Sequence, residues 1–280
     1  MIISISGYKG SGKNLVAKII QYLIMQKKEV WKNKPFQEWL PGWNETVAMV
    51  DSDWEQKSFA HKLKQIASIL TGIPEGKFEN EEFKKTYLGE EWNWWRVYSD
   101  RHIMLSLPDK KVCEDFYNNI NKEVCQIDNK ERLLVRKFLQ LLGTEAIREN
   151  IHPNTWVNAL FTDYKSKFAD KDGFTTYIDE SVEIKMKDHP IWETSHFPNW
   201  IITDTRFPNE LQAVRDRGGL CIKVVLLDEN GNPTVNKDQH PSEISLDHIT
   251  DWDCVISAKK GDIDSLIKQV KKFLILNKII

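Results

Sequence analysis

Residues 7–13 have the types and the spacing of a loop that binds phosphate groups. They read Gly-Tyr-Lys-Gly-Ser-Gly-Lys and fit the pattern G-x-x-x-x-G-K. In such a loop the glycines let backbone N–H groups curl around phosphate oxygens, and the lysine reaches the terminal phosphates. A tight turn without a ligand is the alternative. We expect nucleotide phosphates at Lys9, Gly10, Ser11, Gly12 and Lys13.

The next residue departs from the usual pattern. Asn14 stands where a Ser or Thr hydroxyl normally contacts magnesium. An amide oxygen can still coordinate the ion or orient a metal-bound water. Asn14 is therefore a candidate for the nucleotide site and for a weak magnesium site.

A second group of candidate residues follows the apolar run 200–203. Asp204 and Arg206 come directly after it. Phosphoryl transfer needs positive charge near the transferred oxygens, which Arg206 could supply together with Lys13 and Arg136. Asp204 could hold magnesium through water or receive the acceptor's proton. The alternative for Asp204 is an N-cap or a structural ion pair, with Arg206 as its partner.

Residues 130–149 have the apolar periodicity of an amphipathic helix. Arg136, Gln140 and Gly143 lie at i, i+4 and i+7 and would share a different stripe of that helix. A guanidinium, an amide and a gap without a side chain suit a bound ligand. A stripe that faces solvent would have nearly the same pattern.

Strands and helices alternate along the chain, which predicts an α/β fold with a doubly wound parallel sheet. Ligands bind such sheets beyond the carboxyl ends of the strands. We therefore expect the glycine loop and the corner at Asp204 and Arg206 to face one crevice. The strand patterns lie at residues 2–6, 201–204, 220–227 and 254–257.

The composition argues against several classes of protein. The 280 residues carry a formal net charge of −2 and no basic block, so there is no footprint for nucleic acid. The four cysteines are far apart in the sequence, which indicates reduced thiols. A signal peptide and a long apolar run are both missing, and we expect a cytoplasmic protein that does not bind membranes. A homodimer is compatible with the sequence, which does not decide the oligomeric state.

Five motifs, taken together, resemble those of bacteriophage deoxynucleoside monophosphate kinases, including those of T-even phages. They occur in the family's order and span most of the chain, so the set is more specific than the glycine loop alone. They are residues 6–13, Phe-Ala-His-Lys-Leu-Lys at 59–64, Leu-Gln-Leu-Leu-Gly-Thr-Glu at 139–145, Asp-Thr-Arg-Phe-Pro-Asn-Glu at 204–210 and His-Pro-Ser-Glu at 240–243.

The resemblance implies phosphorylation of a deoxynucleoside monophosphate by ATP with magnesium, in the host cytoplasm if a phage encodes the protein. It implies a three-layer P-loop kinase fold whose sheet has about five strands in the order 2-3-1-4-5. On that template residues 2–6 are central, 57–60 form one edge, and 201–204 lie between them. The whole chain would be a single kinase domain, with insertions or substrate-covering segments at 75–128 and 165–199.

The resemblance also implies roles for single residues. Lys13 and the loop amides would hold the ATP phosphates, and Lys64 and Arg136 the monophosphate. Gly143 and Trp156 would border the deoxynucleoside, and Gln140 shares the stripe of Gly143. Lys85 falls near an arginine of the family, with Lys84 as the alternative. Base specificity is expected to depend on segments without a counterpart in the family.

Other functions remain open from the sequence. A P-loop kinase of another phosphorylated metabolite would share the fold, and a DNA-linked P-loop NTPase would share the glycine loop. Against the NTPase, Thr205 follows Asp204 where a motor would carry an acidic pair. A hydrolase that uses His240 and Ser242 lacks an aspartate partner at readable spacing.

Overall fold

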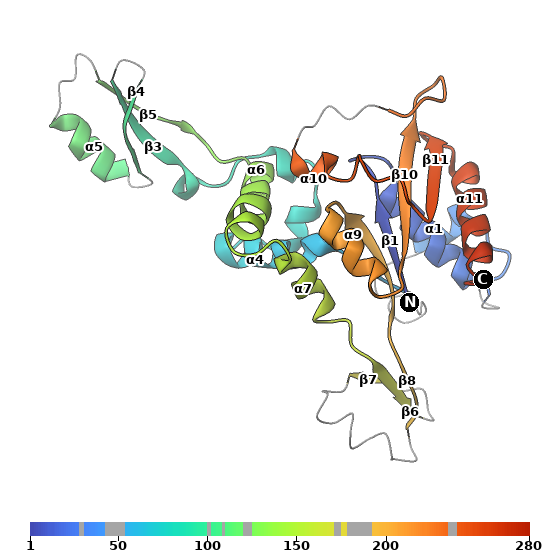
Figure 1. The fold of residues 1–280 in the computed structure, drawn as a ribbon. Coiled ribbons are helices and arrows are strands. Elements are labelled where there is room, and N and C mark those ends of the chain that lie inside the picture. Colours follow the sequence, from blue (N-terminus) through green and yellow to red (C-terminus); the bar gives the residue numbers. More distant parts are fainter. Residues whose placement is uncertain are drawn as a thin grey trace. The chain divides into compact units, whose positions relative to one another are not determined.

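The computed structural model describes residues 1–27, 31–42, 54–99, 102–107, 110–119, 125–170, 175–177, 192–234 and 240–280. The chain divides into two compact units (Figure 1). The first unit comprises Met1–His61 and Asn154–Ile280, and the second comprises Lys62–Pro153. The boundary falls within one helix, α4 (Phe59–Thr71).

A parallel five-stranded sheet is the centre of the first unit. Its strands are β1 (Ile2–Ser6), β2 (Trp54–Lys57), β9 (Asn199–Thr205), β10 (Leu220–Leu227) and β11 (Cys254–Lys259). The spatial order is β11-β10-β1-β9-β2, and all neighbours are parallel. Counted along the chain from the β2 edge, this is the order 2-3-1-4-5 that the resemblance implied. The predicted α/β fold class is confirmed.

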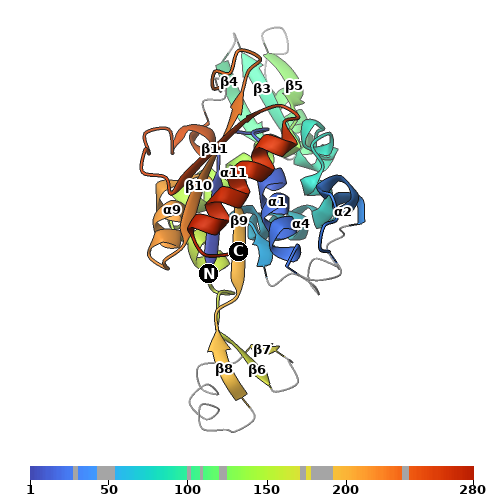
Figure 2. The same ribbon diagram turned by 90° about the vertical axis from the view of Figure 1, so that its right-hand side faces the viewer.

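Helices cover both faces of this sheet. Figures 1 and 2 show α1 (Lys13–Met25) and α11 (Ile263–Leu276) on one face and α9 (Pro208–Arg215) on the other. All five residues of β1 are buried, as expected for a central parallel strand between two helical layers. The core between the sheet, α1 and α11 is mainly aliphatic and includes Ile5, Ile19, Ile222, Ile256 and Val270.

The first unit also contains shorter elements. Helix α2 (Phe36–Gly42) packs on α1, with the Phe36 ring edge-on to Tyr22 at 5.2 Å. Helices α7 (Thr155–Phe161) and α10 (Pro241–Ile244) complete the helices of this unit that the structure describes. A separate antiparallel sheet has the order β7-β6-β8. Its strands are β6 (Lys167–Asp170), β7 (Thr175–Tyr177) and β8 (Trp192–His196).

This small sheet falls within the predicted insertion at 165–199, of which residues 171–174 and 178–191 lie outside the described part. No helix in the described ranges is long and apolar enough to cross a membrane.

The second unit combines short helices with a three-stranded antiparallel sheet of order β4-β3-β5. Its apolar centre includes Phe78, Val135 and Phe138, and a smaller one lies at Val97 and Cys113. The elements after α4 are η1 (Glu75–Glu79), η2 (Phe83–Lys85), η3 (Glu90–Trp92), β3 (Trp94–Ser99), β4 (His102–Leu107), α5 (Lys110–Asn118), β5 (Cys125–Glu131), α6 (Val135–Gln140) and the π-helix η4 (Leu141–Glu149).

Two sequence predictions need correction. The helix predicted over 130–149 begins only at Val135, because β5 pairs with β3 up to Glu131. From Leu141 it winds as a π-helix, so the α-helical spacing that put Gly143 on the stripe of Arg136 does not hold. The edge strand predicted at 57–60 is β2, which ends at Lys57 because α4 begins at Phe59.

Candidate active site

The glycine loop connects β1 to the N-terminus of α1, as the sequence predicts. Gly10 and Gly12 adopt φ angles of 79° and 97°, a region that residues with a side chain rarely enter. Gly12 is the N-cap of α1 and, having no side chain, leaves the first N–H groups of the helix uncapped. The first N–H groups of this 13-residue helix and its dipole therefore favour an anion at the loop.

Gly7 is required by space as well as by conformation. A Cβ atom there would lie 2.3 Å from the carbonyl oxygen of Val224 and 2.7 Å from Oγ of Ser11. Its φ of 145° is also unfavourable for other residues. The loop thus passes directly against β10, which fixes where it leaves the sheet.

Lys13 folds back over its own loop. Its Nζ donates to the carbonyl oxygens of Gly7 at 2.6 Å and Tyr8 at 2.9 Å. Burial, and after it the charge of Arg206, lower the pKa of Lys13 from 10.5 to about 8. The carboxylates of Glu243 and Asp204 oppose this pKa shift. These charges are therefore close enough to Lys13 to affect its protonation.

The corner after β9 lies beside the loop because β9 is the direct neighbour of β1. The hydroxyls of Ser4 and Thr205 bond across the two strands at 2.6 Å and are buried. The backbone N–H of Arg206 donates to Oε2 of Glu210 at 2.8 Å. The predicted convergence of Lys13 and Arg206 is therefore present.

Asp204 makes the contacts of a helix cap, the alternative that the sequence left open. Its Oδ1 accepts the N–H of Phe59 at 2.8 Å. Its Oδ2 accepts the Ser58 hydroxyl at 2.7 Å and the N–H of Ala60 at 2.9 Å. The carboxylate satisfies donors at the start of α4 and ties that helix to β9. Its predicted catalytic role remains a prediction.

The segment 240–247, which includes the His-Pro-Ser-Glu motif, contacts the loop. The guanidinium of Arg206 donates to a Glu243 carboxylate oxygen and, at 3.2 Å, to the carbonyl oxygen of Ser242. Oε2 of Glu243 accepts the N–H of Lys9 at 3.0 Å. The Tyr8 hydroxyl donates to Asp247 at 2.8 Å. Burial, with this bond, raises the pKa of Tyr8 to about 12.

His240 and Ser242 make a local contact with each other. Nδ1 of His240 lies 2.8 Å from the hydroxyl of Ser242 and accepts the N–H of the same residue at 3.2 Å. His240 is thereby the N-cap of α10. The two side chains thus serve the start of a short helix.

The second unit holds a group of cations paired with glutamates. Lys64 bonds Glu79 at 2.5 Å. Lys84 at 2.8 Å and Arg136 at 2.7 Å both bond Glu81. We call Lys64, Lys84 and Arg136 the cation cluster. Lys84, the alternative to Lys85, thus shares the carboxylate of Glu81 with Arg136. Its side chain is only 16% exposed.

The other candidate residues are placed differently. Lys85 bonds Glu82, and its side chain is 61% exposed. Gly143 faces Leu63, whose Cδ2 would lie 2.9 Å from an added Cβ, so its missing side chain allows close packing on α4. Gln140 is the last residue of α6, and Trp156 is a buried residue of α7 in the first unit.

The residues present do not form a preassembled metal cage. Within the described ranges, no three His, Cys, Asp or Glu side chains gather in a way that could hold a metal ion. Asn14, the second residue of α1, is exposed. A carboxylate offers about four acceptor positions, and Asp204 uses three of them. This donor set fits magnesium that arrives with phosphate and keeps several waters.

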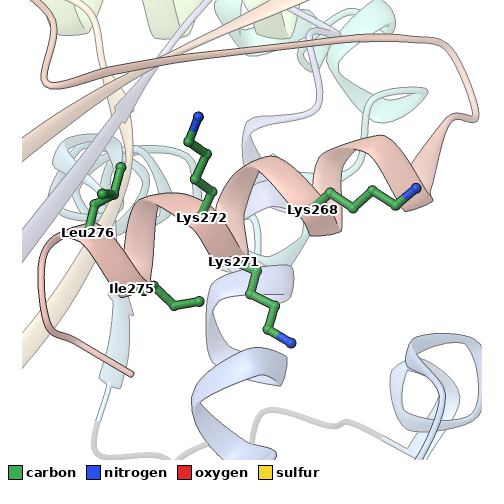
Figure 3. A pocket seen from close by; sticks show the side chains of 5 residues that line it. All are labelled: Lys268, Lys271, Lys272, Ile275 and Leu276. Carbon is green, nitrogen blue, oxygen red and sulfur yellow. The ribbon is translucent and has the colours of Figure 1, made fainter.

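The C-terminal helix carries a shallow pocket of about 330 Å³ (Figure 3). Figure 3 shows three lysines and two apolar side chains projecting from α11: Lys268, Lys271, Lys272, Ile275 and Leu276. None of these residues belongs to the glycine loop or to the segment 240–247. The pocket is therefore not part of the candidate site.

Sequence reasoning missed two features of this site. It gave Glu243 no role, although the His-Pro-Ser-Glu motif pointed to it, and it did not foresee that Asp247 bonds Tyr8. The sequence placed Lys84 second to Lys85, and which of the two contacts phosphate stays a prediction. Glu81 lies just before η2, and its spacing of three residues from Lys84 was the available signal.

Comparison with known proteins identifies relatives in phages. The chain is 27% identical over 158 residues to the deoxynucleotide monophosphate kinase of Enterobacteria phage T4, a match that covers 56% of this chain and 52% of that protein. It is 25% identical over 271 residues to the deoxynucleoside-5'-monophosphate kinase of Escherichia phage T5, covering 88% of this chain and 85% of that protein.

No family model matches the chain. The match with the T4 protein spans about half of that protein's length, whereas the match with the T5 protein extends over most of both chains. Together with the motifs and the fold, these likenesses make the chain similar to phage deoxynucleoside monophosphate kinases.

Proposed function

We propose that the protein transfers a phosphoryl group from ATP to a deoxynucleoside monophosphate and releases the deoxynucleoside diphosphate and ADP. The observation that carries this proposal is the convergence of Lys13 and Arg206 at a glycine loop on the N-terminus of α1. The names of the T4 and T5 relatives support the activity and suggest the class of acceptor.

The loop and its two cations suit the charge that develops in phosphoryl transfer. Loop N–H groups and Lys13 bind the ATP phosphates, and Arg206 adds a second positive charge near them. Lys13 sits in a partly buried site, where electrostatic interactions are stronger than in water. The residues thereby offset negative charge on the transferred group without a covalent step by the protein.

Magnesium is expected to arrive bound to ATP. Asn14 would contribute an amide oxygen, and Asp204 has an acceptor position left for a metal-bound water. The ion would supply additional positive charge at the phosphates.

The proposal assigns the acceptor's monophosphate to the cation cluster of the second unit. Lys64, Lys84 and Arg136 each bond a glutamate in this structure. A phosphate dianion offers these cations three strong acceptor oxygens, which a single carboxylate cannot match. The acceptor would therefore compete with Glu79 and Glu81 for the same donors.

Substitution of Lys13 tests the proposal. Purified protein should convert dGMP or dTMP to the diphosphate, and Lys13→Ala should lower kcat at least about a hundredfold, because a positive charge at the transferred phosphate is lost. The measurement is an ADP-release assay with product analysis. Lys18→Ala, a lysine also on α1, serves as the matched control and should keep turnover.

Full activity of a folded Lys13→Ala protein would end the proposal. If another phosphorylated metabolite released ADP faster than every deoxynucleoside monophosphate, the acceptor would be reassigned within the same chemistry. ATP hydrolysis stimulated by DNA would replace the kinase by an NTPase.

A further inference from the structure

One acidic side chain in the candidate site has no part in the proposed reaction. Glu243 belongs to the His-Pro-Ser-Glu motif, and its side chain is 7% exposed. A carboxylate beside a loop that should attract phosphate repels that phosphate. Its position therefore calls for an explanation.

The two oxygens of Glu243 use donors of different origin. Oε2 accepts the N–H of Lys9, a backbone group of the glycine loop, at 3.0 Å. The other oxygen accepts the guanidinium of Arg206. A loop N–H together with a guanidinium is a donor set that suits a phosphate oxygen. The carboxylate thus has the contacts that a nucleotide phosphate would seek at this place.

We propose that Glu243 is an internal substitute for a nucleotide phosphate, and that ATP displaces its carboxylate from Lys9 and Arg206. This inference rests on the proposed function, since it takes the loop to be the ATP site. Glu243 thereby lowers the affinity for ATP and sets the concentration at which the site fills.

The charges around Lys13 explain why such a substitute is useful without nucleotide. Arg206 lies close enough to Lys13 to destabilise its ammonium, and the carboxylate of Glu243 opposes that effect. Glu243 therefore stabilises two neighbouring cations in the free protein. ATP brings several negative charges to the same donors, and like charges that share one site repel each other. The nucleotide and the carboxylate should not occupy these donors together.

A tether keeps the substitute near the loop. Asp247, which follows α10, accepts the hydroxyl of Tyr8 at 2.8 Å. The segment is thus attached to the loop at a point other than Glu243. Displacement of the carboxylate then requires only a local movement of a side chain or of one short helix, and the substitute stays available when the nucleotide leaves.

Glu243→Gln tests the proposal through ATP binding measured by calorimetry at low ionic strength. The dissociation constant for ATP should fall at least about threefold, which is the effect expected when one partly exposed ion pair no longer competes with ATP. The free variant should melt at a lower temperature than the parent protein, and ATP should raise its melting temperature by a larger amount. Glu229→Gln removes the same charge from an exposed turn and should change neither quantity.

The outcomes separate this inference from the proposed function. If the parent protein binds no ATP, the proposed function fails. If the parent binds ATP but Glu243→Gln binds it no more tightly than Glu229→Gln does, the substitute role fails and Glu243 only positions Arg206.

A second variant covers the case in which Glu243→Gln does not fold. Asp247→Asn keeps the carboxylate of Glu243 and weakens its tether to Tyr8, so ATP should again bind more tightly, by a smaller factor. Unchanged or weaker ATP binding by folded Asp247→Asn would contradict the proposal.

Discussion

Lys13 is a partly buried lysine whose charge depends on pH near neutrality. Burial and the charge of Arg206 lower its pKa to about 8 in the free protein. Because phosphate binding requires the ammonium form, ATP binding above that pH must take up a proton. The dissociation constant for ATP should therefore rise from about pH 8 upward, approaching tenfold per pH unit. Calorimetric titrations between pH 7 and 9.5 measure this rise.

Lys13→Arg is the control for this pH dependence. A guanidinium stays charged throughout this range, so the variant should bind ATP with a nearly constant, although weaker, affinity. Parallel pH profiles for the two proteins would show that another group titrates.

Single residues of the site could be predicted where one short segment contains the whole pattern. The glycine loop is such a segment, because spacing alone fixes which amides face an anion. Glu243 could not be predicted in this way. It lies 234 residues from Lys9 along the chain, and only the packing of α10 against the loop brings the two together.

Helix α4 begins where it does because Asp204 supplies the acceptors for its first turn. Asp204→Ala removes the partners of two backbone N–H groups and one hydroxyl. We expect a loss of about 2 kcal/mol in the free energy of unfolding, the upper end for a cap. Urea unfolding monitored by tryptophan fluorescence measures it.

A second cap in the first unit gives the comparison. Asp262 caps α11 through a bond to the N–H of Ser265 at 3.1 Å. Asp262→Ala should cost only about 1 kcal/mol. Equal losses in the free energy of unfolding would contradict the expectation that Asp204 stabilises its helix more than an ordinary cap does.

The elements that the sequence predicted well are those with a complete apolar pattern. Strands β1, β10 and β11 lie where expected, because burial on one or both faces leaves a clear periodicity. The boundary between β5 and α6 was missed, since β5 is held by pairing with β3 rather than by an apolar repeat. The π-helix was missed because its wider winding leaves no separate signal in a short segment.

The two groups of cations belong to different compact units. Lys13 and Arg206 lie in the first unit, and the cation cluster lies in the second. The sequence indicates one continuous domain, because the boundary falls inside α4, whose apolar repeat runs through it. If each unit holds one substrate, substitutions in one unit should change the KM for the substrate that this unit binds and leave the other KM unchanged.

The cation cluster provides the test of this division. Arg136→Met and Lys84→Met should each raise the KM for the monophosphate about tenfold, because a charge-assisted bond to phosphate is lost, and should leave the KM for ATP within about twofold. Steady-state kinetics with each substrate varied in turn measures both constants. Lys137→Met, next to Arg136 on α6 with a side chain 51% exposed, is the matched control. A larger effect on the KM for the monophosphate from Lys85→Met than from Lys84→Met would assign the phosphate contact to Lys85. Equal changes in both Michaelis constants would contradict the assignment of the two substrates to different units.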